Sequence, residues 1–271
     1  MQKDGFASRR PQVTFLKCGA VCLGTAIHHM ASDGRAFARA AGGGEKAATP
    51  RPPFLDRTAR SPPTVRFDHV EYARPRGGPE PKPKAPFITA ILNISKHQVE
   101  ALKRDAGNAE GNTWLYIAAD VRSRVRPPLP DGYLGKALVR TTAVARADDV
   151  VSGPLRATAR LTDEYVRFQV DFMEQSRSYQ PMGSAGLGRW ATPDTDVYVV
   201  SWLGLPFSDV DFGWGRPAFV GQATLTAAGV VYLVPSPKGG DGGLDIVVGM
   251  EAGRLAEFKE LFYEGLTQSR V

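Results

Sequence analysis

The sequence predicts an α+β fold with mixed or antiparallel sheets and flanking helices, and three features of its pattern carry this prediction. Short β-branched segments follow one another in the last third of the chain, where a parallel sheet would alternate strands with helices. Amphipathic patterns with helical spacing lie on both sides of that run of strands. A hydrophobic content of 42% over 271 residues is enough for a sizeable core.

The N-terminal part of the chain predicts a strand pair followed by a short helix. Residues 12–27, QVTFLKCGAVCLGTAI, are mostly β-branched or small, which indicates two short strands or a hairpin. The sequence GRAFARAA at 34–41 can start a helix, and the glycines and prolines after it end it quickly. Residues 74–86, RPRGGPEPKPKAP, predict an extended crossover linker. We therefore predict an N-terminal domain over 1–73 and a C-terminal domain over 87–271.

The C-terminal domain begins with a strand and a capped helix. Ser95 is a good N-cap for a helix over 95–106, and Gln98 stands at the capping-box position. The prolines and glycines of 127–135 predict a loop. Two further amphipathic helices are expected over 155–178 and 251–266. The expected strands are 87–94, 113–124, 196–205, 218–225, 229–235 and 243–250.

The net charge of +6 invites a nucleic-acid interpretation, but the sequence does not support one. The charges are scattered, no run of five or more Lys and Arg residues occurs, and no recognisable nucleic-acid reading element is present. Basic residues serve a phosphorylated small molecule equally well. We therefore expect a small-molecule partner and no nucleic acid.

Cysteine usage and the N-terminal residues bear on the compartment. Cys18 and Cys22 cannot form a disulfide framework, so we expect a reducing environment, with two buried thiols on one strand face and no metal site. The N-terminus has no apolar segment typical of a secretory signal. The longest nearly apolar stretch of the sequence, around CGAVCLGTAI, is too short and too glycine-rich to span a bilayer. We expect a soluble, cytoplasmic, monomeric protein without membrane association.

The stretch HHMASDG holds the first candidate for chemistry. His29 and Asp33 have H-x-x-x-D spacing, and Gly34 follows them. A neutral imidazole takes a proton near pH 7, which makes histidine the usual general base, and a carboxylate nearby can orient it or hold the backbone. Taken alone, such a pair is more often structural than catalytic, and His28 is a neighbour that can be mistaken for the base.

A second stretch, DFGWG, runs from Asp211 to Gly215. Its first three letters match the protein-kinase DFG motif. However, the sequence has no glycine-rich loop of the kinase type, no HRD and no downstream APE, so we reject a kinase.

The order of the two motifs and the stretches around them resemble the BAHD family of plant acyl-CoA-dependent acyltransferases, and within it the hydroxycinnamoyltransferases. The resemblance spans nearly the whole chain. The matching stretches are QVTFLKCGAVCLGTAIHHMASDG, PPFLDR, AADVRSRVRPPLPDGYLG and VSWLGLPFSDVDFGWGRPAFVG.

The resemblance implies a two-domain fold like that of chloramphenicol acetyltransferase, with a channel between the domains. His29 would deprotonate an alcohol or amine acceptor, which attacks the thioester of an acyl-CoA co-substrate, and no cofactor would be permanently bound. Asp33 would hold its loop by pairing with an arginine. The DFGWG residues would be structural, Asp211 pairing with Arg122 in preference to Arg124, and Trp202 is a candidate substrate contact. The structural residues of this motif are Asp211, Phe212, Gly213, Trp214 and Gly215.

The sequence also departs from the family pattern. We expect an incomplete N-terminal domain, because family members begin well before QVTF, and an internal deletion, because NAEGN stands where the family has a helix. Lys136 replaces a neutral amide in YLGK. Gly204 stands where shikimate- or quinate-using members often carry arginine, which favours an amine or other uncharged acceptor. The alternative to an acyltransferase is therefore a catalytically inactive, truncated family member that acts at most as a binding or interaction protein.

Overall fold

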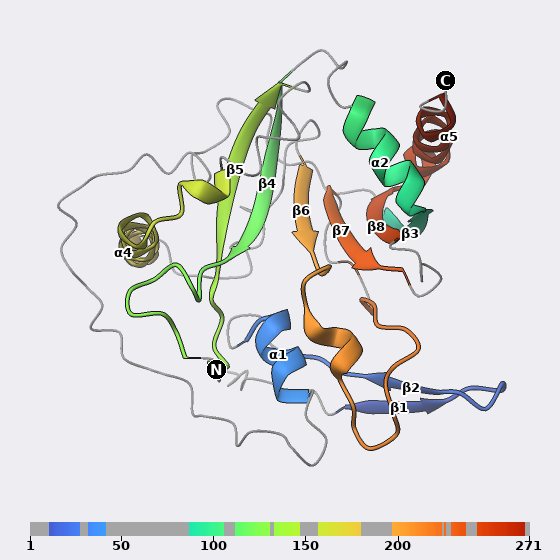
Figure 1. Ribbon diagram of the computed structural model, residues 1–271, viewed down its shortest axis with the longest axis horizontal. Coiled ribbons are helices and arrows are strands. Elements are labelled where there is room, and N and C mark those ends of the chain that lie inside the picture. Colours follow the sequence, from blue (N-terminus) through green and yellow to red (C-terminus); the bar gives the residue numbers. More distant parts are fainter. Residues whose placement is uncertain are drawn as a thin grey trace. The chain divides into compact units, whose positions relative to one another are not determined.

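The computed structural model describes residues 11–27, 32–41, 87–105, 112–130, 133–146, 157–179, 197–223, 225, 229–236 and 243–268. The chain divides into two compact units, whose helices and strands are labelled in Figure 1. The first unit joins the N-terminal segment to 130–138 and 205–223, and the second holds most of the remaining chain. The predicted linker over 74–86 lies outside the described residues, so the predicted domain boundaries stay a prediction.

The first unit contains the predicted hairpin. Strand β1 (Gln12–Phe15) pairs antiparallel with β2 (Val21–Gly24), and Gly19 in the turn has a φ of 86° that favours glycine. The hairpin is therefore confirmed. The expectation of buried thiols is wrong, because Cys18 lies in the exposed turn and Cys22 on an exposed strand.

Helix α1 (Gly34–Ala41) packs against the short 3-10 helix η6 (Pro206–Asp209) within the same unit. A Cβ atom at Gly34 would lie 3.1 Å from the Leu205 side chain and 3.4 Å from the Phe207 ring. Glycine at 34 thus lets the first turn of α1 approach these apolar side chains closely. The predicted short helix after HHMASD is confirmed.

The second unit is built on a six-stranded sheet with the order β3-β8-β7-β6-β4-β5. Strand β8 runs antiparallel to both β3 and β7, whereas β6 runs parallel to both β4 and β7. The mixed sheet of the α+β prediction is confirmed. The strands are β3 (Phe87–Ile94), β4 (Asn112–Asp120), β5 (Leu138–Arg146), β6 (Val197–Ser201), β7 (Val230–Pro235) and β8 (Leu244–Glu251).

Two strand predictions need correction. Within the mixed sheet, β6 and β7 are parallel neighbours. Parallel neighbours require a connection that returns the chain to the same end of the sheet. The predicted strand over 218–225 falls in that connection, and its described residues, 218–223 and 225, form no strand. Strand β5 was not predicted.

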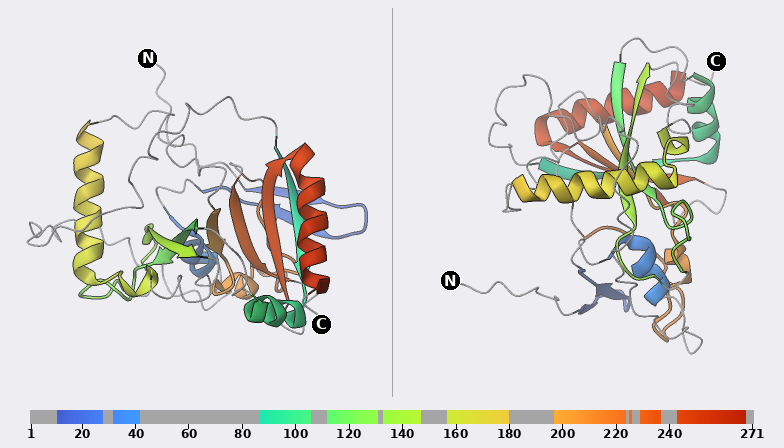
Figure 2. Two further views of the ribbon diagram at one scale, coloured as in Figure 1. Left: turned by 90° about the horizontal axis from the view of Figure 1, so that it is seen from above. Right: turned by 90° about the vertical axis from the view of Figure 1, so that its left-hand side faces the viewer.

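Helix α5 (Ala252–Gln268) covers one face of β3 and β8, as Figure 2 shows. Its Leu255 packs with Leu92 and Val248, and Phe258 and Phe262 border this cluster. Such burial of apolar surface is the main favourable contribution to folding. The opposite face of the sheet carries a second apolar cluster, formed by Leu225, Val234 and Val247 with Trp202 and Tyr232.

Helix α2 (Lys96–Asp105) begins with the predicted capping box. The Gln98 side chain accepts a hydrogen bond from the Ser95 backbone N–H at 3.0 Å, and the Ser95 hydroxyl accepts one from the Gln98 backbone N–H at 3.3 Å.

The helix predicted over 155–178 is shorter than expected. Helix α4 (Asp163–Tyr179) starts anew because the Thr162 hydroxyl accepts a hydrogen bond from the Tyr165 backbone N–H, as an N-cap does. Only a short helical turn precedes it in the described residues from 157 onward. Leu161, between the two, is buried.

None of the helices that the structure describes combines the length and the apolar character that crossing a bilayer requires.

Candidate functional site

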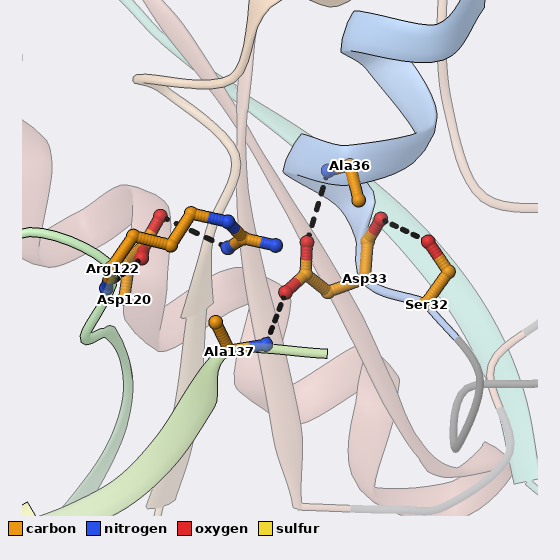
Figure 3. A network of polar contacts seen from close by, with 6 residues as sticks. All are labelled: Ser32, Asp33, Ala36, Asp120, Arg122 and Ala137. Carbon is orange, nitrogen blue, oxygen red and sulfur yellow. Dashed lines mark hydrogen bonds and ion pairs between the residues drawn. The ribbon is translucent and has the colours of Figure 1, made fainter. Parts of the chain in front are cut away.

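Asp33 is almost completely buried and clamps two segments of the first unit together (Figure 3). Its Oδ1 atom accepts a hydrogen bond of 3.0 Å from the backbone N–H of Ala36, which makes Asp33 the N-cap of α1. Its Oδ2 atom accepts one of 2.8 Å from the backbone N–H of Ala137. One carboxylate thereby fixes the start of α1 and the segment that follows the YLGK sequence.

The loop-holding role expected of Asp33 thus has a physical basis in two backbone amides. The arginine partner that the family resemblance implies for Asp33 stays a prediction. His29 lies outside the described residues, as does His28. Along the chain, His29 stands four residues before Asp33, so the buried clamp follows the candidate base closely.

The segment that Asp33 holds is itself tightly folded. The backbone N–H of Tyr133 donates to the Pro130 carbonyl at 2.9 Å, which closes a turn. A Cβ atom at Gly135 would lie 2.5 Å from the Tyr133 hydroxyl oxygen, so only glycine allows the ring to lie over this backbone. Lys136 lies between this turn and the clamped Ala137 amide.

The DFGWG stretch forms a loop closed by its own aspartate. Asp211 Oδ1 accepts hydrogen bonds from the backbone N–H groups of Gly213 at 2.7 Å and Gly215 at 3.0 Å. Both glycines have φ values near +90°, at 91° and 93°, which residues with a side chain rarely adopt. The turn presents Trp214 outward, with 69% of its surface exposed. The two glycines therefore serve a tight turn, and Asp211, which closes it, is partly buried.

Arg122 pairs with the carboxylate of Asp120, two residues before it in the chain. Its Nη1 atom lies 3.3 Å from Asp120 Oδ2, and its backbone N–H donates to Asp120 Oδ1 at 2.9 Å (Figure 3). Arg124, the other candidate, donates from Nη1 to the Thr158 carbonyl at 2.8 Å. The predicted ion pair between Asp211 and Arg122 stays a prediction.

Trp202 follows β6 and belongs to the apolar cluster on the sheet face opposite α5. Its ring meets the Tyr232 ring edge to face, with centroids 5.8 Å apart. It is partly buried against Leu225, Val234 and Val247. The role of Trp202 as a substrate contact stays a prediction.

Arg140 of β5 is a buried cation that sequence reasoning missed. Its guanidinium carbon lies 3.7 Å from the centroid of the Tyr116 ring and 5.5 Å from that of Tyr198. Burial raises the pKa of the Tyr198 hydroxyl, Arg140 opposes the rise, and Tyr232 adds to it. The signal in the sequence is an arginine in the interior of a largely apolar and β-branched run, LVRTTAVAR.

Sequence reasoning also missed a polar cluster that joins β3, β8 and the residue after β7. The Asn93 side-chain amide donates to Asp245 Oδ1 at 2.7 Å and to the Ser236 hydroxyl at 2.9 Å. Asp245 and Ser236 are buried. Polar residues inside the apolar strand runs FITAILNI and LDIVVGME are the signal that could have indicated it.

In the described part of the chain, no group of three His, Cys, Asp or Glu side chains has an arrangement that could hold a metal ion.

Comparison with known proteins gives a consistent result. The model of the "Transferase family" matches residues 88–265. Putrescine hydroxycinnamoyltransferase 1 of rice is 47% identical over 310 residues, covering 94% of this chain and 69% of its own length. Shikimate O-hydroxycinnamoyltransferase of tobacco is 31% identical over 306 residues, covering 93% of this chain and 69% of its own length.

Solved structures support the same fold. Vinorine synthase superposes with a TM-score of 0.63 at 20% identity, covering 91% of this chain and 63% of its own. TRI101 of F. sporotrichioides, solved with coenzyme A and T-2, superposes with a TM-score of 0.60 at 16% identity, covering 89% of this chain and 65% of its own. The α+β fold is confirmed. This chain thus spans about two thirds of the length of these proteins.

The rice comparison also bears on the expected internal deletion. The matched region is 310 residues long, whereas the whole chain has 271 residues. The relative therefore carries internal segments that have no counterpart here, and the place of the deletion at NAEGN stays a prediction.

Proposed function

Because this chain belongs to the transferase family, whose BAHD acyltransferases its motifs resemble, we propose that it transfers a hydroxycinnamoyl group from coenzyme A to an amine. The 47% identity to a relative named for putrescine and hydroxycinnamoyl transfer is the observation that carries this proposal. An acyl-CoA-dependent acyltransferase is confirmed at the level of the family. The donor, the acceptor and the roles of individual residues are the proposal.

His29 acts as the general base. It takes a proton from the acceptor amine, whose nitrogen attacks the thioester carbonyl carbon of the acyl-CoA. The tetrahedral intermediate then collapses, the carbon–sulfur bond breaks, and the coenzyme A thiolate takes the proton from the imidazolium. The products are an amide and free coenzyme A. Because no acyl group is held on the protein, Cys18 and Cys22 have no part in the reaction.

Asp33 is a positioning residue rather than a catalytic one. Both of its carboxylate oxygens are occupied by backbone amides of Ala36 and Ala137. A buried carboxylate that accepts such hydrogen bonds is held in one orientation. It therefore fixes the backbone that follows His29, and preorganised geometry of this kind reduces the entropic barrier to reaction.

Two observations support an amine acceptor over a carboxylate-bearing alcohol. The relative named for putrescine is 47% identical, whereas the one named for shikimate is 31% identical. Gly204 stands where shikimate-using members often carry arginine, a side chain that binds carboxylates with two parallel hydrogen bonds.

A second candidate function is a non-catalytic binding protein, favoured by the exposed apolar face of the hairpin. Strand pairing places Val13 opposite Leu23 and Phe15 opposite Val21 on one face, and 80% of the Phe15 surface is exposed. Exposed apolar patches often mark interaction surfaces. Phe15→Asp would weaken association measured by analytical ultracentrifugation if this candidate is right.

The direct test incubates the whole chain with p-coumaroyl-CoA and a panel of amines and alcohols, including 1,4-diaminobutane and shikimate. We expect an amide product with the diamine, loss of turnover in His29→Ala, and retained turnover in His28→Ala. A thermal melt of each variant separates loss of chemistry from loss of folding. If the folded wild-type chain acylates nothing, the non-catalytic candidate replaces the acyltransferase.

A further inference from the structure

We infer that the outer edge of β2 pairs antiparallel with the β2 edge of a second copy of this chain, with the two Cys22 residues opposite each other at the two-fold axis. The pairing extends the two-stranded hairpin into a four-stranded sheet. This inference concerns association between copies of the chain, and it is independent of the proposed acyl transfer.

The hairpin exposes more of its surface than a two-stranded sheet normally does. Every residue of β1 and β2 is exposed except the half-buried Leu23. The exposed fraction reaches 80% at Phe15 and 47% at Val21. Among the described residues, β1 and β2 form a sheet of their own. Because an isolated two-stranded hairpin is marginally stable at best in water, additional strands stabilise it.

The hydrogen bonds of the hairpin show which backbone groups of β2 point away from β1. The backbone N–H of Leu16 donates to the Ala20 carbonyl at 2.8 Å. Along an antiparallel ladder, hydrogen-bonded and non-hydrogen-bonded pairs alternate, so the pair of Thr14 and Cys22 is again hydrogen-bonded. The N–H and C=O groups on either side of Cys22 therefore point to the outer edge of β2.

The two outer edges of the hairpin differ in their protection against further pairing. Strand β1 follows Pro11, which has no N–H to donate, and Lys17 comes soon after the strand. Proline and lysine are residues by which natural edge strands avoid pairing with other chains. Residues 20–27, AVCLGTAI, contain no proline and no charged residue. The edge of β2 is therefore the one suited to accept another strand.

The sequence of β2 complements itself in an antiparallel register centred on Cys22. In this register Val21 of each copy lies opposite Leu23 of the other, which joins apolar side chains and pairs the outward backbone groups. The two Cys22 residues form a non-hydrogen-bonded pair, in which Cα atoms are about 4.5 Å apart. No charge is brought into the contact, and the two-fold axis supplies both partners of each pair. A second copy of the chain therefore fits this edge.

The contact is small, because it joins one short strand of each copy. Stable protein–protein interfaces bury about 1,200–2,000 Å² in total, which exceeds what one short strand pair offers. We therefore expect a weak dimer whose population rises with protein concentration. At low concentration the monomer expected from the sequence should prevail.

The first test is sedimentation equilibrium of the full chain with a thiol reductant present, at concentrations up to about 1 mM. We expect a reversible monomer–dimer equilibrium in the wild type. Cys22→Lys places two ammonium groups opposite each other at the axis and should raise the dissociation constant roughly fivefold or more. Circular dichroism of each variant checks that it folds.

Thr14→Lys is the matched control for Cys22→Lys. Thr14 is exposed and pairs with Cys22 across the hairpin, so the same charge is added at the same level of the neighbouring strand. In the four-stranded sheet the two Thr14 residues lie three strand spacings apart, about 14 Å, where water and salt screen their charges. Thr14→Lys should therefore keep the wild-type dissociation constant.

The second test traps the dimer through its cysteines. Both Cys18 and Cys22 are exposed and free. Oxidised glutathione converts two opposed thiols to one disulfide and leaves as two molecules of reduced glutathione. A Cα separation of about 4.5 Å lies within disulfide range, so Cys18→Ser should still give a covalent dimer on a non-reducing gel. Cys22→Ser should not, because Cys18 lies in the turn, away from the axis.

The inference is overturned by any of three results. The first is a wild-type chain that stays monomeric at every concentration. The second is an equal dissociation constant for Cys22→Lys and Thr14→Lys. The third is a Cys22→Ser variant that forms as much covalent dimer as Cys18→Ser. If Cys22→Lys does not fold, the comparison of the two serine variants decides.

Discussion

The Oδ2 atom of Asp33 accepts a hydrogen bond of 2.8 Å from the backbone N–H of Ala137, 104 residues further along the chain. A local sequence motif, H-x-x-x-D, is thereby tied to a distant loop, and the same carboxylate caps α1 through Ala36. Removal of the carboxylate leaves two backbone donors of the first unit without this acceptor.

Asp33→Ala should therefore destabilise the chain by about 2–4 kcal/mol, the sum of a lost N-cap and an unsatisfied buried donor. Urea unfolding followed by circular dichroism measures the change. Asp33→Asn retains one side-chain oxygen acceptor and should lose less. A loss below about 0.5 kcal/mol in Asp33→Ala would mean that the clamp contributes little to stability.

Asp211→Ala should destabilise the fold more than it affects substrate binding. The Asp211 carboxylate accepts hydrogen bonds from Gly213 and Gly215, and a lost hydrogen bond of this kind is worth about 1 kcal/mol. Thermal melting measures stability, and calorimetry with p-coumaroyl-CoA measures affinity. Unchanged melting together with lost affinity would contradict this prediction.

The predicted pairing of Asp211 with Arg122 is tested by a double-mutant cycle. If the ion pair forms, Asp211→Ala and Arg122→Ala should show a coupling energy above about 0.5 kcal/mol in urea unfolding. The matched cycle with Arg124→Ala should show none, since Arg124 donates to the Thr158 carbonyl. Equal couplings in the two cycles would remove the case for Arg122.

Gly204→Arg should shift acceptor preference toward carboxylate-bearing alcohols such as shikimate. Gly204 is exposed and has no positive φ, and a Cβ atom there meets no atom within 4 Å, so a side chain can begin at this position without a clash. The expected result is a rise in the shikimate-to-diamine ratio of kcat/KM, with Gly204→Ala as the control for volume. If Gly204→Arg and Gly204→Ala give the same ratio, the arginine charge does not set the acceptor.

Asp163 should make stability depend on acidic pH. Burial alone would raise its pKa, but hydrogen bonds from Arg167 and Arg126 and the charges of both lower it overall. A depressed pKa means that the stabilisation is present above the unfolded pKa of Asp163 and is lost as pH falls through its folded pKa. The melting temperature of Asp163→Asn should therefore lie below that of wild type at pH 7, and the gap should close in acid. A gap that does not change with pH would point to packing instead of charge.

Local patterns in the sequence predicted the local structures well. The hairpin at 12–27, the Ser95–Gln98 capping box, α1 and α5 depend on side-chain periodicity and nearby hydrogen bonds, which a short stretch of sequence specifies. The family resemblance likewise rested on contiguous motifs, and the family match and relatives confirm it. The DFGWG glycines likewise make a local turn, with positive φ values at Gly213 and Gly215.

Tertiary structure decided everything that joins residues far apart in the chain. The acceptor of the Ala137 amide is a side chain 104 residues earlier in the chain. The parallel run of β6 beside β7 and the position of Asp245 opposite Asn93 depend on which strands become neighbours. The segment 218–225 has the composition of a strand, yet the topology uses it to return the chain to the start of β7. Strand pairing is set by long-range burial of apolar faces, and one strand's sequence does not contain that information.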